Sequence, residues 1–226
     1  MNIQNSSLNK YQLSKEIVEN AIYLDFEGEG KKLDGTIPCP HMAGLYRPYT
    51  SDYKYSSLFF KFAWKPVKAG HNNKNDKIGD FYHLIAELIE EAERENRRVI
   101  YWTIHEEKII EIYTPDLLER FIAVGINLHK PAKKYAKQRA LVFDENEEKG
   151  LNQFLKAIKR NSSLIEKCRP TAAEACRRLD NYSTNNKRWR NWSMPQKRVA
   201  RDLLRYNIED CLGILRLARK FGNSTF

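Results

Sequence analysis

Apolar and aromatic residues in the first third of the chain form three short runs separated by turn-forming residues. The runs cover residues 21–27, 43–49 and 56–64, and the third is rich in aromatic residues, which favour strands. Gly, Pro and an Asp-Gly pair mark turns between the first two runs, and the link to the third is short. The pattern predicts three consecutive strands in an antiparallel meander.

A helical period follows these runs. Apolar residues recur at the three- and four-residue spacing of a helix: Phe81, Leu84, Ile85, Leu88 and Ile89. This spacing predicts a helix over residues 80–96, with Asp80 as its N-cap because an Asp side chain accepts from the first free amides. VIYWTI, residues 99–104, predicts a strand, and EEKIIEIY, residues 106–113, predicts a second helix.

The remainder of the chain has a mostly helical pattern. Helices are predicted over residues 116–124, 151–158, 171–179 and about 195–221. Thr171 and Glu174 have the spacing of a capping box, and residues 141–143 form either a short strand or an apolar anchor. The elements together predict an α/β fold with a mixed sheet: three antiparallel strands, then helix, strand and helix, with a helical C-terminal part. Because no repeat or linker divides the chain, we expect a single domain over residues 1–226, with a basic helical insertion at about 130–200.

The net charge adds an expectation about partners. The 226 residues include 39 Lys and Arg against 29 Asp and Glu, a formal charge of +10, and the excess lies mainly after His129. Such an asymmetry favours a polyanionic partner, most simply nucleic acid. The alternative is a basic solvated surface with no partner.

Membrane and disulfide classes are not favoured. No segment approaches the roughly 20 apolar residues of a membrane span, and the polar start lacks the apolar centre of a signal peptide. We therefore expect a cytoplasmic protein without a membrane partner. The four cysteines contain no CxxC pair, which indicates reduced structural thiols rather than a disulfide framework or a zinc site.

Acidic residues end the first predicted strand, and residues 21–30 contain no Lys or Arg. Asp25 and Glu27 are two residues apart, so they share one face of the strand and repel each other. A divalent cation with a preference for oxygen ligands, Mg²⁺ or Mn²⁺, would resolve this repulsion. Glu106 stands at a strand-to-helix junction, and Asp210 lies on the last helix with Tyr206 four residues earlier on the same face.

The order Asp25-x-Glu27, Glu106 and Tyr206-xxx-Asp210 resembles the DEDD 3′-5′ exonuclease superfamily, whose fold is ribonuclease-H-like. The tyrosine spacing is similar to the DEDDy branch, and the chain is closer still to the predicted RecB-associated RNase-H-like nuclease group. The resemblance covers about residues 21–220 and departs at the middle motif, where the family has Asp after Asn-x-x-Phe and this chain has YWTIHEEK. Glu107 therefore remains an alternative to Glu106.

The resemblance implies a chemistry for these residues. Two Mg²⁺ or Mn²⁺ ions would be held by Asp25, Glu27, Glu106 and Asp210 and would hydrolyse phosphodiester bonds, with Tyr206 orienting the attacking water. The expected activity is removal of nucleotides from the 3′ end of single-stranded DNA or RNA. Two alternatives stay open: a structure-specific endonuclease on the same fold, and a nucleic-acid-binding module with a degenerate site.

A basic segment with two tryptophans, residues 187–201, precedes the Asp210 motif. Cations can contact phosphates while exposed indoles stack on unpaired bases, so the segment predicts a single-strand contact. The expected contact residues are Lys187, Arg188, Trp189, Arg190, Trp192, Lys197 and Arg198. The alternative is that the tryptophans anchor the core beneath a solvated loop. A second basic run is interpreted as a generic solvated face: Lys130, Lys133, Lys134, Lys137 and Arg139.

Some patterns carry no functional prediction. LVFDENEEK, residues 141–149, contains acids and a Lys as another nuclease signature does, but no strand separates them, so a charged turn is favoured. The five histidines show no ligand spacing, and Glu29 is interpreted as a turn residue. No GxxxxGK[ST] sequence occurs, so a helicase would be a separate partner chain.

Overall fold

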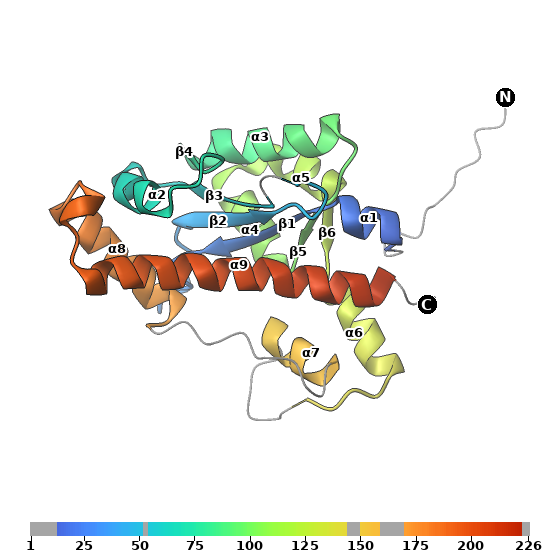
Figure 1. Ribbon diagram of the computed structural model, residues 1–226. Helices are drawn as coiled ribbons and strands as arrows, with labels where there is room; N and C mark the ends of the chain where they lie inside the picture. The colour runs from blue at the N-terminus through green and yellow to red at the C-terminus, as the bar shows by residue number, and fades with distance from the viewer. Residues whose placement is uncertain (1–12, 52–53, 144–149, 159–169, 223–226) are drawn as a thin grey trace.

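The computed structural model describes residues 13–51, 54–143, 150–158 and 170–222 (Figure 1). Over these ranges the chain forms a six-stranded mixed sheet with helices on both faces, an α/β fold as predicted. The strands are β1 (Ile22–Glu27), β2 (Met42–Tyr46), β3 (Tyr55–Phe59), β4 (Lys77–Ile78), β5 (Val99–Tyr101) and β6 (Gly125–Asn127).

The order of strands in the sheet is β4-β3-β2-β1-β5-β6. β1 pairs antiparallel with β2 and β2 with β3, so the predicted meander is confirmed. β5 pairs parallel with β1 on its other side, β6 is parallel to β5, and β4 is parallel to β3. Because β1 and β5 are parallel neighbours, the residues that follow them emerge at the same edge of the sheet.

Nine helices are described in these ranges. They are α1 (Lys15–Asn20), α2 (Lys65–His71), α3 (Phe81–Arg94), α4 (Ile104–Tyr113), α5 (Leu118–Val124), α6 (His129–Gln138), α7 (Leu151–Ile158), α8 (Ala172–Asn185) and α9 (Met194–Gly222). Figure 1 shows α3 over one face of the sheet and the long α9 across the opposite face. The predicted Asp80 cap is confirmed, since its Oδ1 accepts from the His83 amide at 3.0 Å.

Alternation along β1 divides its side chains between two apolar cores. Ile22 and Leu24 pack with α3 residues such as Leu88, whereas Tyr23 belongs to the core beneath α9. Period-two alternation places Asp25 and Glu27 on the same face as Tyr23. The acids of β1 therefore face α9.

Several element boundaries differ from the predicted ones. The third strand ends at Phe59 rather than residue 64, because the chain turns through a 3₁₀ segment, Phe62–Trp64, into α2. Pro66 favours this helix start, since proline lacks the amide that a strand would use and fits a first helical turn. α8 continues to Asn185, beyond the predicted residue 179.

Several short segments were missed or left open, among them α1 and the two-residue strand β4. β6 was not predicted, because three partly buried residues, Gly125–Asn127, contain too few positions to show alternation. Residues 141–143 form no strand, and the side chains of Leu141 and Phe143 pack against the core, which supports the anchor alternative. The predicted charged turn at 144–149 lies outside the described residues.

Two further observations concern the described helices and cysteines. Within the described ranges, no helix combines the length and apolar composition needed to cross a bilayer. Cys39, Cys176 and Cys211 are free thiols, and Cys168 lies outside the described residues.

Candidate metal centre

The end of β1 supplies the first two acids. Asp25 lies opposite Gly44 of β2, and Glu27 lies opposite Met42. Glu27 is buried, whereas Asp25 keeps partial exposure. Since both side chains face α9, the helix that crosses this part of the sheet determines their surroundings.

α9 brings the third acid to the same place. Carboxylate oxygens of Asp25, Glu27 and Asp210 all lie within 4.8 Å of one another, although Asp210 follows Glu27 by more than 180 residues. The Tyr206 hydroxyl hydrogen-bonds Asp210, and the negative charges of all three acids act on it. Tyr206, Asp25, Glu27 and Asp210 thus form one cluster, as their order in the sequence predicts.

Glu106 lies beside this cluster, at the start of α4. It is buried, and its Oε2 accepts from both the amide and the hydroxyl of Thr103, each at 3.1 Å. Thr103 and Glu106 form a capping box, so Glu106 also stabilises the start of α4. Its charge also acts on Asp25, although it does not belong to the group within 4.8 Å. Because the two capping bonds share one oxygen, capping and metal binding are compatible.

Glu107, the alternative third acid, is held elsewhere. Its Oε1 accepts from the Tyr101 hydroxyl at 2.9 Å and from the Asn127 side-chain amide at 3.1 Å. Both partners belong to the strands β5 and β6. The structure therefore favours Glu106 as the acid that accompanies Asp25.

Asn207 is a member of the site that the sequence analysis missed. Its side chain is fully buried and its amide donates to Asp25 Oδ2 at 2.7 Å and to the Asp25 carbonyl at 3.2 Å. The amide also lies 3.4 Å from Glu27 Oε1, and its Oδ1 accepts from the Tyr55 hydroxyl at 2.9 Å. The sequence could have indicated this role, because Asn207 precedes Asp210 by three residues and so lies on the same face of α9, the face that meets the sheet.

The acids destabilise each other's charged forms. Burial raises the pKa of Asp25 well above its ordinary value, and the three neighbouring acids raise it further. Burial and then Asp210 raise the pKa of Glu27 to about 8, although the Asn207 hydrogen bond opposes this shift. Burial likewise raises the pKa of Asp210 to about 7 and that of Glu106 to about 7.

This arrangement fits a divalent cation of the hard, oxygen-binding kind. None of the four acids has a Lys or Arg ion-pair partner among the described residues, so their repulsion is not offset by the chain itself. Clustered carboxylates are the ligands that Mg²⁺ and Mn²⁺ prefer. The residues that would hold such ions are Asp25, Glu27, Glu106 and Asp210.

The predicted single-strand contact needs a correction. Trp192 is only 3% exposed, packs in the core beneath α8 and α9, and donates from its indole nitrogen to the Asn186 carbonyl at 2.8 Å. It is therefore an anchor and has no face for a base. Trp189 is partly exposed, with the Lys197 ammonium 5.8 Å from its ring, and packs against α2 at Gly70.

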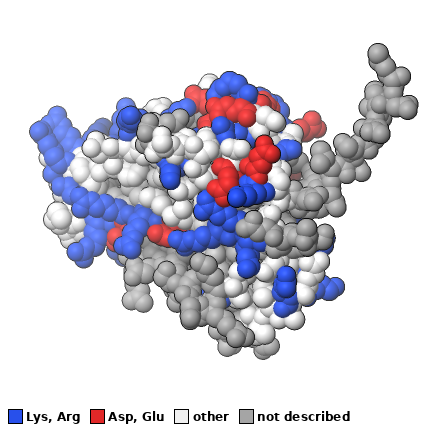
Figure 2. All heavy atoms as spheres, turned by 45° about the vertical axis from the view of Figure 1, so that its right-hand side comes forward, with Lys and Arg blue, Asp and Glu red and all other residues white. Residues whose placement is uncertain are grey.

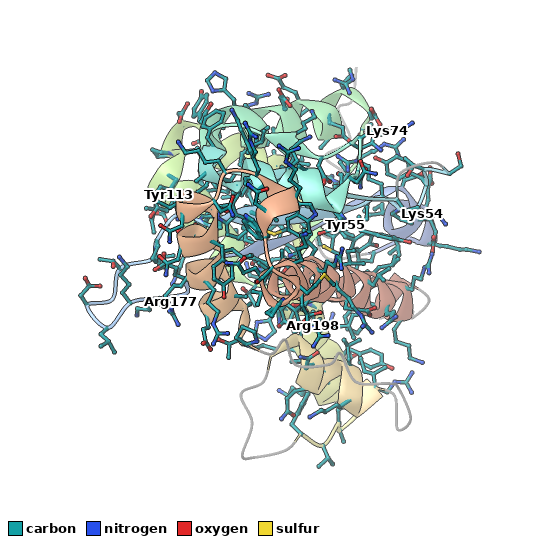
Figure 3. The ribbon with its side chains drawn as sticks, turned by 60° about the vertical axis from the view of Figure 1, so that its left-hand side comes forward. Lys54, Tyr55, Lys74, Tyr113, Arg177 and Arg198 are labelled. Carbon is teal, nitrogen blue, oxygen red and sulfur yellow. The ribbon has the colours of Figure 1, made fainter. Side chains whose placement is uncertain are left out.

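Most charged members of that segment are exposed, and Arg198 lies well away from Asp210 along α9. Lys187, Arg188, Arg190 and Arg198 are exposed, and Figure 2 shows Lys and Arg in a band across one face. Arg198 precedes Asp210 by twelve residues of one helix, about 18 Å at 1.5 Å per residue. Figure 3 shows Arg198 and Arg177 on the side of the molecule formed by α8 and α9, well apart from Lys54 and Lys74. Arg198 is thus not adjacent to Asp210.

No protein-family model matches the chain, and no curated protein or solved structure matches it.

Proposed function

We propose that the protein is a metal-dependent nuclease of the DEDDy type with a ribonuclease-H-like fold, which removes nucleotides from the 3′ end of single-stranded DNA or RNA. The observation that carries the proposal is the convergence of Asp25, Glu27 and Asp210, from a strand and a distant helix, within 4.8 Å.

The sheet supports the fold part of the proposal. After α2 and the short edge strand β4, the three antiparallel strands are followed by a helix, a parallel strand and a helix, with β1 in the middle of the sheet. This is the arrangement that the resemblance implies. Asp25 and Glu27 lie at the end of β1, and Glu106 follows β5. Because β1 and β5 are parallel neighbours, these acids lie at the same edge of the sheet.

Each residue has a role in the proposed reaction. Asp25, Glu27, Glu106 and Asp210 would hold two Mg²⁺ or Mn²⁺ ions, which supply an activated water and stabilise the leaving 3′ oxygen. Tyr206, hydrogen-bonded to Asp210, would orient the water. Asn207 holds the Asp25 carboxylate in place against α9. The site acts by positioning and by charge, without a covalent intermediate.

A cleavage assay tests the proposal. A 5′-labelled single-stranded oligonucleotide, DNA and RNA in parallel, is incubated with the protein in Mn²⁺ or in EDTA. We expect a ladder that shortens from the 3′ end in Mn²⁺ only, and a loss of rate of at least ~100-fold in Asp25→Asn and Asp210→Ala, because each removes a ligand.

Adjacent glutamates provide a matched control. Glu106→Gln should lose activity to a similar extent, whereas Glu107→Gln, one residue further along the same helix, should retain most of it, since its carboxylate is held by Tyr101 and Asn127. Undiminished cleavage by a folded Asp25→Asn protein contradicts the proposal. Binding without turnover in Mn²⁺ would instead identify a binding module, and products cut internally would identify an endonuclease.

A further inference from the structure

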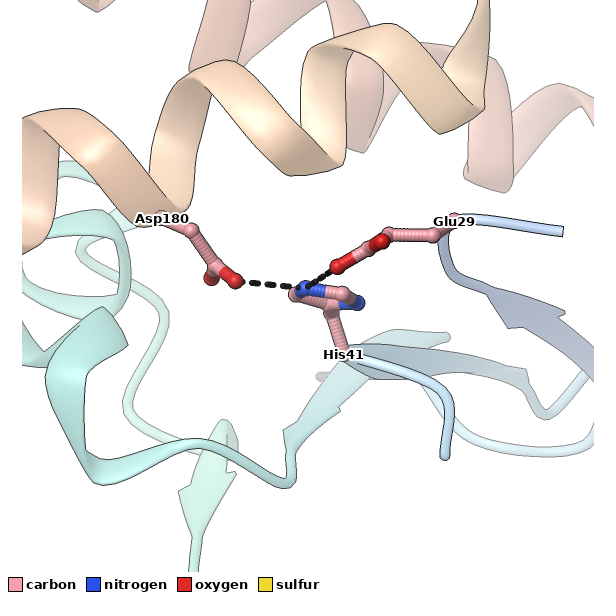
Figure 4. Close-up of side chains that lie close together, drawn as sticks. All are labelled: Glu29, His41 and Asp180. Atoms are coloured by element: carbon pink, nitrogen blue, oxygen red, sulfur yellow. Dashed lines mark hydrogen bonds and ion pairs between the residues drawn. The ribbon is translucent and has the colours of Figure 1, made fainter. Parts of the chain in front are cut away.

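A second cluster of charged side chains lies outside the four acids. His41 Nε2 is 2.9 Å from Asp180 Oδ2 and 3.7 Å from Glu29 Oε1 (Figure 4). Figure 4 shows Asp180 reaching down from α8, Glu29 following β1, and His41 at the start of β2. One ligand atom of each residue lies within 4.8 Å of the others, so composition alone is compatible with a metal ion.

The chain, however, supplies its own cation to this cluster. The Lys61 ammonium forms an ion pair with Asp180 Oδ2 and lies 2.6 Å from His41 Nε2. The Trp64 indole nitrogen donates to the other Asp180 oxygen at 2.6 Å. Both carboxylate oxygens of Asp180 therefore have partners, and Asp180, which lies on α8, holds the Lys61 ammonium in place. A metal ion at this cluster would have to displace that ammonium.

The backbone places Lys61 near the acids. The His41 amide donates to the Glu27 carbonyl at 2.8 Å, and the Phe60 amide donates to the His41 carbonyl at 2.9 Å. Neighbouring strands are about 4.8 Å apart, so the chain at Lys61 runs about 10 Å from Glu27. The charges of Glu27, Asp180 and Lys61 all act on the pKa of the Cys176 thiol, which agrees with this proximity.

Lys61 and its neighbours also face solvent. The Lys61 side chain is 35% exposed, and an ammonium has three donors, so its contacts with Asp180 and His41 leave at least one donor for a ligand. Phe62 is 60% exposed, and the Lys65 ammonium lies 5.8 Å from its ring centroid. Cations beside an exposed aromatic ring are typical of proteins that bind single-stranded nucleic acid. In this protein such a group lies at the same edge of the sheet as the acids, rather than at residues 187–198.

We propose that Lys61, oriented by Asp180 and His41, binds a phosphate of the single strand whose end lies at the acids. The inference rests on the proposed function, because it names the residue that guides that substrate. Asp180 and His41 are positioning residues, and the exposed ring of Phe62 offers a stacking surface for the adjacent base.

The salt dependence of binding tests this role. Affinity for a fluorescent single-stranded oligonucleotide is measured by anisotropy over a series of NaCl concentrations, in the Asp25→Asn background so that no substrate is cut. Each phosphate contact with a single strand contributes about 0.7 to the slope of log K against log salt. Lys61→Gln should therefore lower the slope by about 0.7, and Lys61→Arg should keep it.

A matched control removes the same charge elsewhere. Lys77 lies on the edge strand β4 and pairs at 2.6 Å with Glu87 of α3, on the face of the sheet opposite α8 and α9 (Figure 1), so Lys77→Gln should leave the slope unchanged. Lys61→Met is made in parallel, so that a folding defect of one neutral variant leaves the other to decide.

The outcomes separate this inference from the proposed function. Equal slopes for Lys61→Gln and Lys77→Gln, with cleavage by the unmodified protein intact, overturn the role of Lys61 alone. Absence of both binding and cleavage in the unmodified protein overturns the proposed function and this inference with it. Stoichiometric binding of Zn²⁺ that is lost in His41→Gln also overturns the inference, because the cluster would then hold a metal ion in place of Lys61.

Discussion

At the scale of single residues, Asn207 explains how the site is held together in the protein alone. Its amide is the hydrogen-bond donor that reaches both Asp25 and Glu27, and its oxygen is fixed by Tyr55, which Figure 3 labels beside α9. A neutral donor reduces the repulsion between two carboxylates without neutralising them. Asn207 thus holds two acids in position, and their raised pKa values favour the protonated forms until a metal ion binds.

Asn207→Asp should weaken the metal-free protein markedly. The substitution replaces a donor 2.7 Å from Asp25 Oδ2 by an acceptor, so a buried repulsion takes the place of a hydrogen bond. We expect the free energy of unfolding in EDTA to fall by about 1–3 kcal/mol. Thermal melts in EDTA and in Mn²⁺ measure the effect, and Mn²⁺ should restore part of the loss.

Asn191→Asp is the control, because Asn191 is exposed and the substitution adds the same charge. Similar melting temperatures for the two variants in EDTA would show that Asn207 does not govern the cluster.

At the scale of elements, the site depends on how closely α9 approaches β2. The approach occurs at Gly44, which lies opposite Asp25 in the sheet. A Cβ on Gly44 would lie 1.8 Å from Asn207 Oδ1 and 3.0 Å from the Tyr55 ring. A glycine is therefore required here by the packing of a helix on a strand, not by the backbone conformation of the strand.

Gly44→Ala should displace α9 and the residues it carries. Overpacking of this kind costs about 1–3 kcal/mol of unfolding free energy, and cleavage should fall with it, because Asp210 and Asn207 move away from β1. Denaturant unfolding and the cleavage assay measure both effects. Gly79→Ala should cost less, since the nearest atom to its Cβ is a Leu84 side-chain carbon at 3.3 Å. An unchanged activity in Gly44→Ala would contradict this account.

At the scale of the whole molecule, the charges are separated. Glu27, Glu106 and Asp210 are buried at one edge of the sheet and Asp25 is half-buried there, whereas the exposed side of α9 is basic. Figure 2 shows the resulting band of Lys and Arg. The exposed basic residues of α9 are Arg198, Arg201, Arg205, Arg216, Arg219 and Lys220. A surface of this kind attracts polyanions at long range and more weakly at high salt.

The buried acids also predict how stability changes with pH. The pKa of Glu27 is about 8 in the folded protein, against an ordinary 4.5, and the pKa values of Asp210 and Glu106 are about 7. Between pH 4 and 8 the folded protein holds more protons than the unfolded chain, so its stability falls as pH rises. We expect the metal-free protein to lose on the order of a few kcal/mol between about pH 5 and 8.

Urea unfolding in EDTA at several pH values measures this dependence. Mn²⁺ should stabilise the protein more at pH 8 than at pH 5, because metal binding competes with protons. Glu27→Gln should flatten the dependence in EDTA. A stability that rises between these pH values would show that the acids are not mutually destabilising.

Local patterns in the sequence predicted much of the framework. The meander, the Asp80-capped helix and the final helix followed from hydrophobic periodicity and capping, which depend on neighbouring residues only. The grouping of Asp25, Glu27 and Asp210 was predicted through the order of the motifs. The start of α2 and the short β6 were missed, because aromatic propensity and three-residue segments do not distinguish a strand from its alternatives.

The sequence by itself thus determined the meander, the principal helices and the acids that end β1, because these features are encoded in a few adjacent side chains. Only the tertiary structure decided which polar groups face one another. The Asn207 bridge, the burial of Trp192 and the pairing of Lys61 with Asp180 each depend on contacts between segments far apart in the chain. The choice of Glu106 over Glu107 depends on how α4 packs on β5 and β6. Residue type and spacing cannot specify such contacts, because the packing of helices on the sheet sets them.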